Sequence, residues 1–198
     1  MPNLAATLKK SFEGRCAQLR ERPDGAGLVV RARLAAVEAY KDAAMSMLPD
    51  NTQAAAEAVQ EAREQLERGR QEAAGDAADA ALSESDRLLR GARLRVGLCS
   101  EDRSEAWRVF SDCLEVTCVE SLPLQSRVDL VAGLIIAGKD AESKVVLSSL
   151  RTAVATGIAA QAIVAEGLTT LHACGVPDAA ITRIRESLGV RGWSDAEQ

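Results

Sequence analysis

The segment from Thr52 to Val96 carries the longest helical pattern in the sequence. Its small and apolar residues recur every three or four positions, a heptad-like rhythm that places them on one seam of a helix. Glutamates with partners four positions further along the chain lie on the outer face of this helix. The seam comprises Val59, Ala62, Leu66, Gly69 and Ala73. The pattern predicts either one very long helix or two nearly collinear helices.

A single helix over this segment would be about 65 Å long at 1.5 Å per residue. A compact domain of this chain length has a radius of gyration of about 16 Å. The helix is therefore either broken near residues 75–86, where Gly75 and the polar run Ser83–Asp86 interrupt the pattern, or it projects and packs on something else. The sequence leaves both alternatives open.

Helical spacing also dominates the rest of the chain, and no stretch alternates apolar and polar residues as a strand does. Aromatic residues make up 3% of the chain, so the core must be aliphatic. The predicted helices outside 52–96 span residues 4–19, 28–48, 103–121, 123–138, 141–156, 158–173 and 179–188. We predict an all-α fold with a long helical hairpin or coiled-coil-like region at 1–98, a compact helical bundle at 99–190 and a tail at 191–198.

Charge and hydropathy disfavour several classes of partner. The formal net charge is −5 and no quarter of the chain is strongly basic, so no nucleic-acid or anionic-membrane footprint stands out. The longest charge-free run, residues 152–165, is too short to span a bilayer. The N-terminus lacks the pattern of a secretion signal. We expect a cytoplasmic protein, or one assembled into a particle, with no membrane partner.

The five cysteines are odd in number and irregular in spacing, and no two have the C-x-x-C spacing of a zinc or redox site. Each lies among apolar residues, where a free thiol acts as a small hydrophobe. They are Cys16, Cys99, Cys113, Cys118 and Cys174. This usage predicts a reducing compartment.

The sequence offers few candidates for catalytic or ligand-binding residues. His172 is the single histidine, and it cannot face Cys174 on a helix because positions i and i+2 point apart. A histidine at a helix end that stabilises the last carbonyls is the simpler interpretation. Paired carboxylates such as Glu101–Asp102, or Asp76 with Asp79, lie in polar contexts, and no phosphate-binding glycine motif occurs. We predict no catalytic, cofactor-binding or metal-binding residues, no cofactor and no small-molecule substrate.

Residues 169–188 resemble the spacing of a helix-turn-helix DNA reader, with Gly175-Val176 in the turn and Arg183 and Arg185 on the second helix. Two features depart from that pattern. Leu171 stands where an alanine is usual, and Asp178 opens the second helix with an acid. A plain structural corner gives the same apolar spacing.

These observations favour a non-enzymatic structural or interaction protein. It would be a subunit of a larger or homo-oligomeric assembly that docks through its alanine-rich helix faces, chiefly along 52–96. A virion or other particle component fits this description. The alternative is a DNA-binding regulator or packaging adaptor that uses residues 169–188.

Overall fold

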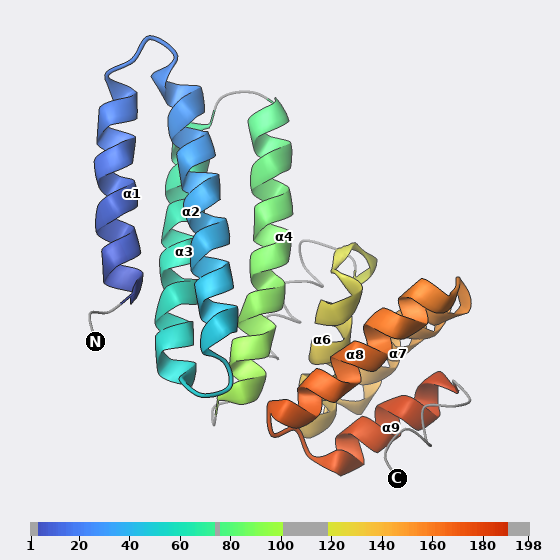
Figure 1. Ribbon diagram of the computed structural model, residues 1–198. Coiled ribbons are helices and arrows are strands. Elements are labelled where there is room, and N and C mark those ends of the chain that lie inside the picture. Colours follow the sequence, from blue (N-terminus) through green and yellow to red (C-terminus); the bar gives the residue numbers. More distant parts are fainter. Residues whose placement is uncertain (1–3, 74–75, 101–118, 190–198) are drawn as a thin grey trace. The chain divides into compact units, whose positions relative to one another are not determined.

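The computed structural model describes residues 4–73, 76–100 and 119–189, which form α-helices and one short 3-10 helix, with no strand among them (Figure 1). The all-α prediction is confirmed. The predicted helix 103–121 lies outside the described residues apart from its last three, and the predicted tail does so entirely. The elements are α1 Leu4–Arg20, α2 Gly25–Met47, α3 Thr52–Glu72, α4 Asp76–Cys99, η1 Val119–Ser121, α6 Leu124–Ile136, α7 Asp140–Ala155, α8 Ile158–Ala173 and α9 Asp178–Leu188.

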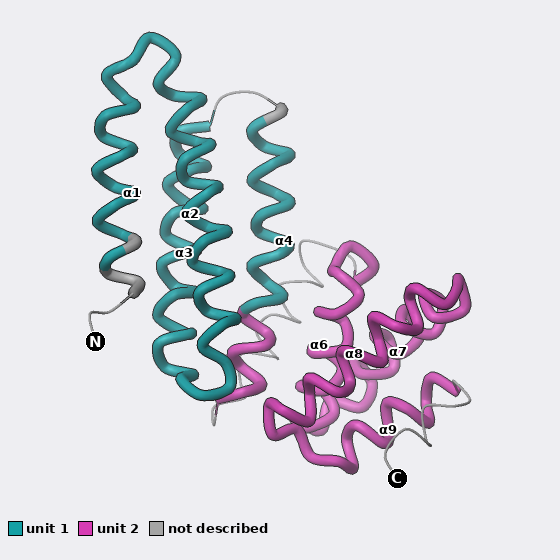
Figure 2. The backbone as a smooth tube through the Cα atoms, viewed as in Figure 1, with its two compact units in different colours: residues 1–92 teal, residues 93–198 magenta. Residues whose placement is uncertain are grey.

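The chain divides into two compact units, residues 1–92 and residues 93–198 (Figure 2). We call them unit 1 and unit 2. The sequence-based prediction placed this division at residue 98. Helix α4 contributes to both, since its residues 93–99 belong to unit 2. Each unit has its own buried residues and is described separately.

In unit 1, consecutive helices run in opposite directions (Figure 1). Segment 52–96 is two helices, because α3 ends at Glu72 and α4 begins at Asp76. Of the two alternatives left open, the broken helix is the one observed, and its halves fold back on each other instead of continuing in line. The run Ser83–Asp86 does not interrupt α4. Arg87 pairs with Glu84 and Arg90 pairs with Asp86 along the helix surface, which supports the helix where its sequence is polar.

The seam of α3 is buried inside unit 1. Val59, Ala62, Leu66 and Gly69 are all buried. A Cβ atom at Gly69 would lie 3.0 Å from Leu82 Cδ2 on α4 and 3.7 Å from Arg33 Cβ on α2. The small residues therefore let three helices of the same chain approach closely.

Two local signals fix where helices of unit 1 begin. The Asn51 side chain accepts a hydrogen bond from the Ala54 N–H at 3.1 Å, so Asn51 is the N-cap of α3. Helix α2 begins at Gly25, earlier than the predicted start at Leu28. A Cβ at Gly25 would lie 2.5 Å from the Leu19 carbonyl oxygen, so the tight α1–α2 turn requires glycine there.

A buried polar network joins the first three helices. Arg33 of α2 is 2% exposed and donates to Gln65 Oε1 at 2.6 Å and, through Nη2, to Glu72 Oε1 at 2.9 Å, both on α3. Gln65 donates to Glu13 Oε1 of α1 at 3.0 Å. Arg20 of α1 also pairs with Glu72. The guanidinium is thus surrounded by acceptors that balance its burial.

The core of unit 2 is mainly leucine, valine and isoleucine. It gathers residues from the end of α4, from η1 and from helices α6–α9. Its fully buried leucines include Leu130 and Leu134 on α6, Leu150 on α7, and Leu168 and Leu171 on α8. This core holds together the elements that carry the candidate sites.

Candidate functional site

The corner at residues 169–188 consists of the end of α8, a short turn and α9. Gly175 adopts a φ of 70°, a left-handed conformation that favours glycine, and the Val176 N–H donates to the Leu171 carbonyl at 3.1 Å. Val176 is buried, as are Ile181 and Ile184 on α9. Residues 169–188 therefore form an αα-corner, which is the arrangement that both a DNA reader and a plain structural corner would have.

The arginines of this corner have acidic neighbours. Arg183 Nη2 lies 2.8 Å from Asp140 Oδ1 at the start of α7. Asp178 and Glu186 balance Arg183 and Arg185 in the formal charge of 169–188. The outer surface of α9 therefore has no surplus of positive charge.

His172 lies on the surface, with 73% of its side chain exposed. Its Nδ1 atom is 3.1 Å from Asp178 Oδ1, so the side chain bridges α8 and the first turn of α9. No cysteine in the described part of the chain is hydrogen-bonded to this histidine. The structure therefore gives His172 a position at the helix corner and does not join it to Cys174.

A buried ion pair in unit 2 joins Arg95 of α4 and Asp129 of α6. Arg95 Nε donates to Asp129 Oδ2 at 2.9 Å; Nη2 lies 2.8 Å from Oδ1, a charge contact outside hydrogen-bond geometry. The Asp129 side chain is 3% exposed. Burial raises the pKa of Asp129 to about 6 against the opposing attraction of Arg95.

Gln125 connects this pair to α8. With its amide oriented to satisfy both neighbours, Gln125 accepts a hydrogen bond from Arg95 Nη2 at 2.7 Å and donates one to the Ile163 carbonyl at 3.2 Å. A Cβ at Gly167 would lie 2.8 Å from the nearer polar atom of the Gln125 amide, so the absence of a side chain there makes room for the amide. Three helices therefore meet around the Arg95 guanidinium.

Two thiols lie beside the same guanidinium. Cys99 ends α4 and Cys174 follows α8. Both residues are half-buried and free. The interaction with Cys99 and the charge of Arg95 lower the pKa of Cys174, although burial opposes them. The interaction with Cys174 and burial raise the pKa of Cys99. Nothing in the spacing of the cysteines indicates this pair.

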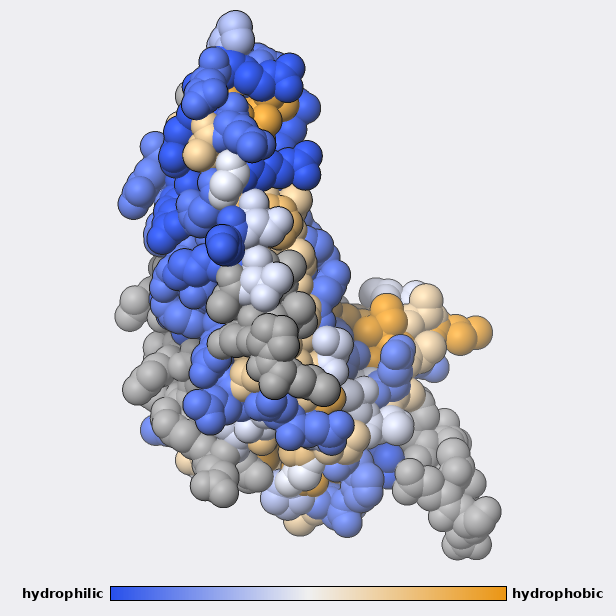
Figure 3. Space-filling model, turned by 60° about the vertical axis from the view of Figure 1, so that its left-hand side comes forward, coloured by the Kyte–Doolittle hydropathy of each residue, from blue (hydrophilic) through white to orange (hydrophobic). Residues whose placement is uncertain are grey.

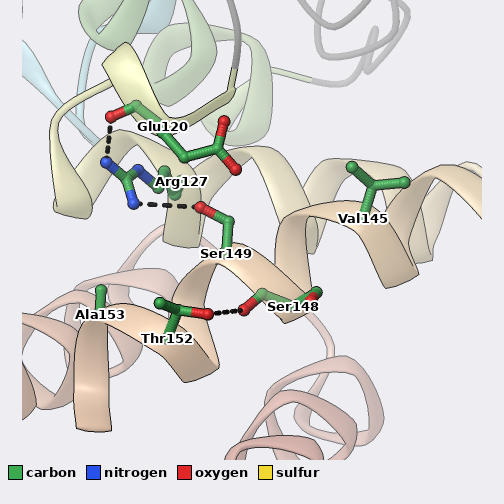
Figure 4. A pocket seen from close by; sticks show the side chains of 7 residues that line it. All are labelled: Glu120, Arg127, Val145, Ser148, Ser149, Thr152 and Ala153. Atoms are coloured by element: carbon green, nitrogen blue, oxygen red, sulfur yellow. Dashed lines mark hydrogen bonds between the residues drawn. The ribbon is translucent and has the colours of Figure 1, made fainter. Parts of the chain in front are cut away.

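A surface hollow of about 460 Å³ lies where η1, α6 and α7 meet (Figure 4). Arg127 spans it: Nη1 donates to Ser149 Oγ at 3.1 Å, Nε to the Leu122 carbonyl at 3.0 Å, and Nη2 to the Glu120 carbonyl. Its donors are thus used to hold η1 on the bundle. The hollow contains no arrangement of nucleophile and base.

Comparison with known proteins gives no relative. No family model, curated protein or solved structure significantly matches this chain. Within the described residues, no three histidine, cysteine, aspartate or glutamate side chains are grouped as metal ligands. No helix of that part of the chain is long and apolar enough to cross a membrane.

Proposed function

We propose that this protein is a non-enzymatic structural subunit that self-associates through the outer face of α8. The observation that carries the proposal is an exposed apolar face without charge on the first two turns of this helix. Ile158 is 83% exposed and Ile163 is 42% exposed. Ala159 and Ala162 are exposed between them. We call these four residues the α8 face.

The α8 face is unusual for the described surface. The exposed large hydrophobic residues are Val145, Ile158 and Ile163, and all three lie on the neighbouring helices α7 and α8. Figure 3 shows hydrophobic side chains that project at the right of the view. Ile158, Ala159, Ala162 and Ile163 are adjacent on one helix, and adjacent exposed apolar residues of this kind mark protein–protein contact sites.

The seam of 52–96 is a poorer docking surface than the sequence suggested, because unit 1 buries it. The argument for self-association therefore rests on α8. Its two alanines would let a partner helix approach closely, and its isoleucines would supply apolar area. Because the run 152–165 has no charged residue, two copies of the face would not repel each other.

The ends of the face suggest an antiparallel pairing. If two copies of α8 crossed near Ala162, Glu166 of one copy would lie beside Ile158 at the N-terminus of the other. The N-cap of α8 is Gly157, which offers no side-chain hydrogen bond. A carboxylate is favourable near the free N–H groups and the positive dipole end of a helix. A two-fold symmetric dimer would make this contact twice.

The test is the oligomeric state of the full chain by sedimentation equilibrium across micromolar concentrations. The wild type should be a dimer or larger, and Ile158→Glu with Ile163→Glu should dissociate it. Ala179→Glu with Thr182→Glu, on exposed positions of α9, adds the same charge elsewhere and should leave the mass unchanged. Glu166→Lys should weaken association, since it places a cation at the helix N-terminus. A wild type that stays monomeric throughout would overturn the proposal.

The corner at 169–188 supports a second candidate, a DNA-binding regulator or packaging adaptor. Its support is the short turn and the 43% exposure of the Arg183 side chain. This candidate predicts DNA binding that weakens steeply with salt and is lost on Arg183→Ala with Arg185→Ala. The absence of binding at low salt would remove it, and the balanced charge of the corner makes it the weaker of the two.

A further inference from the structure

We propose that Gln125 is a positioning residue for the α8 face: its side-chain amide, oriented by Arg95, holds the backbone of Ile163 and so couples a buried ion pair to self-association. The effect on association rests on the self-association proposed above, whereas the hold on α8 is a property of unit 2 alone. The two parts are therefore measured separately.

The half of α8 that carries this face buries few of its own side chains. Residues 158–163 are exposed or half-buried, and the first buried residue of the helix is Val164. Gly157, the N-cap, offers no side-chain hydrogen bond. The large buried side chains of α8 come later in the helix, at Leu168 and Leu171. The position of the first turns of α8 therefore depends strongly on polar contacts.

Two glutamine amides supply such contacts. Gln161 Nε2 donates to the Val154 carbonyl at 3.3 Å, which ties the first turn of α8 to the end of α7. Gln125 on α6 donates to the Ile163 carbonyl at 3.2 Å. Because Ile163 belongs to the α8 face, this second bond acts on the backbone of the surface that would contact a partner.

Arg95 fixes the direction of the Gln125 amide. Its Nη2 atom donates to the Gln125 side-chain oxygen at 2.7 Å, and the same nitrogen lies 2.8 Å from Asp129 Oδ1. An amide has one accepting end and one donating end, so a bond from Arg95 to the oxygen turns the NH2 group toward α8. Asp129 in turn holds the guanidinium by accepting a hydrogen bond from Nε at 2.9 Å. Contacts therefore run from the ion pair through Gln125 to the α8 face.

Gly167 is the complementary feature on α8, one helical turn after Ile163. The three atoms nearest to a Cβ at this position all belong to the Gln125 amide, and the nearest lies at 2.8 Å. Glycine inside a helix is less favourable than alanine. The weaker helix former therefore stands where the amide needs space. Gly167→Ala separates the two effects, because it strengthens the helix and displaces the amide.

The first measurement is hydrogen exchange of the full chain at a concentration where it is monomeric. Gln125→Ala should lower the protection of peptides within 158–167 by about 2–10-fold, because a net hydrogen bond is lost. Gln60→Ala, at an exposed position of α3, is the matched control and should leave these peptides unchanged. Circular dichroism verifies that each variant is folded. Unchanged protection of 158–167 in Gln125→Ala would overturn the proposal.

Two further variants test what the amide does. Gln125→Glu keeps an oxygen that accepts from Arg95, but the carboxylate has no N–H for the Ile163 carbonyl, so exchange within 158–167 should accelerate. Gly167→Ala should accelerate it as well, although alanine is the better helix former. In the Gln125→Ala background the same substitution should slow exchange, since no amide remains to be displaced. Slower exchange for Gly167→Ala in both backgrounds would mean that helix propensity governs α8, and the proposal would be wrong.

Sedimentation equilibrium measures the consequence for association. Gln125→Ala and Gly167→Ala should each weaken it by up to about 10-fold, because only chains with the face held in place can pair. Neither variant changes a side chain of the face. Faster exchange with unchanged association would refute the coupling. A wild type that stays monomeric would refute self-association itself, and the exchange data would still decide whether Gln125 holds α8.

Discussion

Unit 1 and unit 2 are both built from helices, but their interiors differ in chemistry. In unit 1 the buried residues are largely alanines and valines, and the largest fully buried side chains are Arg33, Tyr40 and Leu89. In unit 2 the corresponding large side chains are all leucines. The two units of one chain therefore fill their interiors with different kinds of side chain.

The difference follows from how much area each residue type buries. Alanines allow helices to approach closely, but each removes little apolar surface from water. Unit 1 offsets this with polar contacts between helices, including Lys9 with Glu61 at 2.9 Å and the network around Arg33. Unit 2 fills its core with larger aliphatic side chains and contains the buried Arg95–Asp129 pair. Unit 1 should therefore be sensitive to lost polar contacts, and unit 2 to lost methyl groups.

Arg33→Ala should have the largest effect. It removes the donor that satisfies Gln65 Oε1 and leaves Glu72 with Arg20 alone, and removing one partner of a buried ion pair costs about 3–5 kcal/mol. Hydrogen exchange should show the loss in peptides of unit 1, and urea unfolding gives its size. Arg31→Ala, at an exposed position of the same helix, is the control and should cost less than about 0.5 kcal/mol. Equal losses for the two variants would contradict the importance of the network.

In unit 2, Leu134→Ala should reduce the free energy of unfolding by about 3 kcal/mol, because it leaves a cavity in an apolar core. The exposed Val145→Ala on α7 removes methyl groups outside the core and should cost less than about 0.5 kcal/mol. Urea unfolding measures both. If Leu134→Ala were as mild as the control, the leucine core could not be the main source of stability in unit 2.

Close packing in unit 1 can be tested at the seam. Gly69→Leu should destabilise by roughly 1–3 kcal/mol, since its side chain meets Leu82 and Arg33 where α2, α3 and α4 converge. Gly14→Ala on α1 is the matched control, because a Cβ there meets no atom within 4 Å. That substitution should stabilise by about 0.5–1 kcal/mol through helix propensity. Thermal melts should move in opposite directions for the two variants.

Helix periodicity predicted much of this fold. The fold class, the Asn51 cap and the break between α7 and α8 at Gly157 all follow from local rules, because spacing and capping act over a few residues. The direction of the chain after Glu72 does not follow from them. A broken helix can continue or turn back, and the choice depends on which surfaces of the same chain cover the seam. The seam looked available to a partner because the sequence does not show that α2 and α4 cover it.

The candidate sites were harder to predict for the same reason. Arg95 and Cys99 are one helical turn apart, but nothing local indicates that Asp129 or Cys174 lies beside them. The irregular cysteine spacing excluded familiar short motifs and left a long-range pair unseen. The exposed α8 face was visible as the charge-free run 152–165. Which of its residues are exposed depends on the packing of α8 against the bundle, which buries Val164, Leu168 and Leu171.

The two units should also respond to pH in opposite directions. In unit 1, burial raises the pKa of Glu13 and Glu72, but hydrogen bonds and charge from Gln65, Arg68, Arg33 and Arg20 outweigh it, so both pKa values lie below 4.5. Their contribution is complete above pH 4.5 and is lost as pH falls through the lowered values. In unit 2, the pKa of Asp129 is about 6, above its ordinary 3.8, so the folded state binds an extra proton between these values. That contribution grows as pH falls from about 6 to about 4.

Urea unfolding from pH 7 to pH 3 tests these signs. Each proton changes the slope of the unfolding free energy by at most about 1.4 kcal/mol per pH unit, the smallest of the effects considered. Asp129→Asn should reduce the rise in the unfolding free energy between pH 6 and pH 4, whatever it costs in stability at pH 7. Glu72→Gln should reduce the fall in the unfolding free energy below pH 4.5. If Asp129→Asn and Glu72→Gln changed the unfolding free energy over the same pH range, the buried charges of the two units would not have opposite effects on the pH dependence of stability. The contrast between the units would then rest on their apolar cores alone.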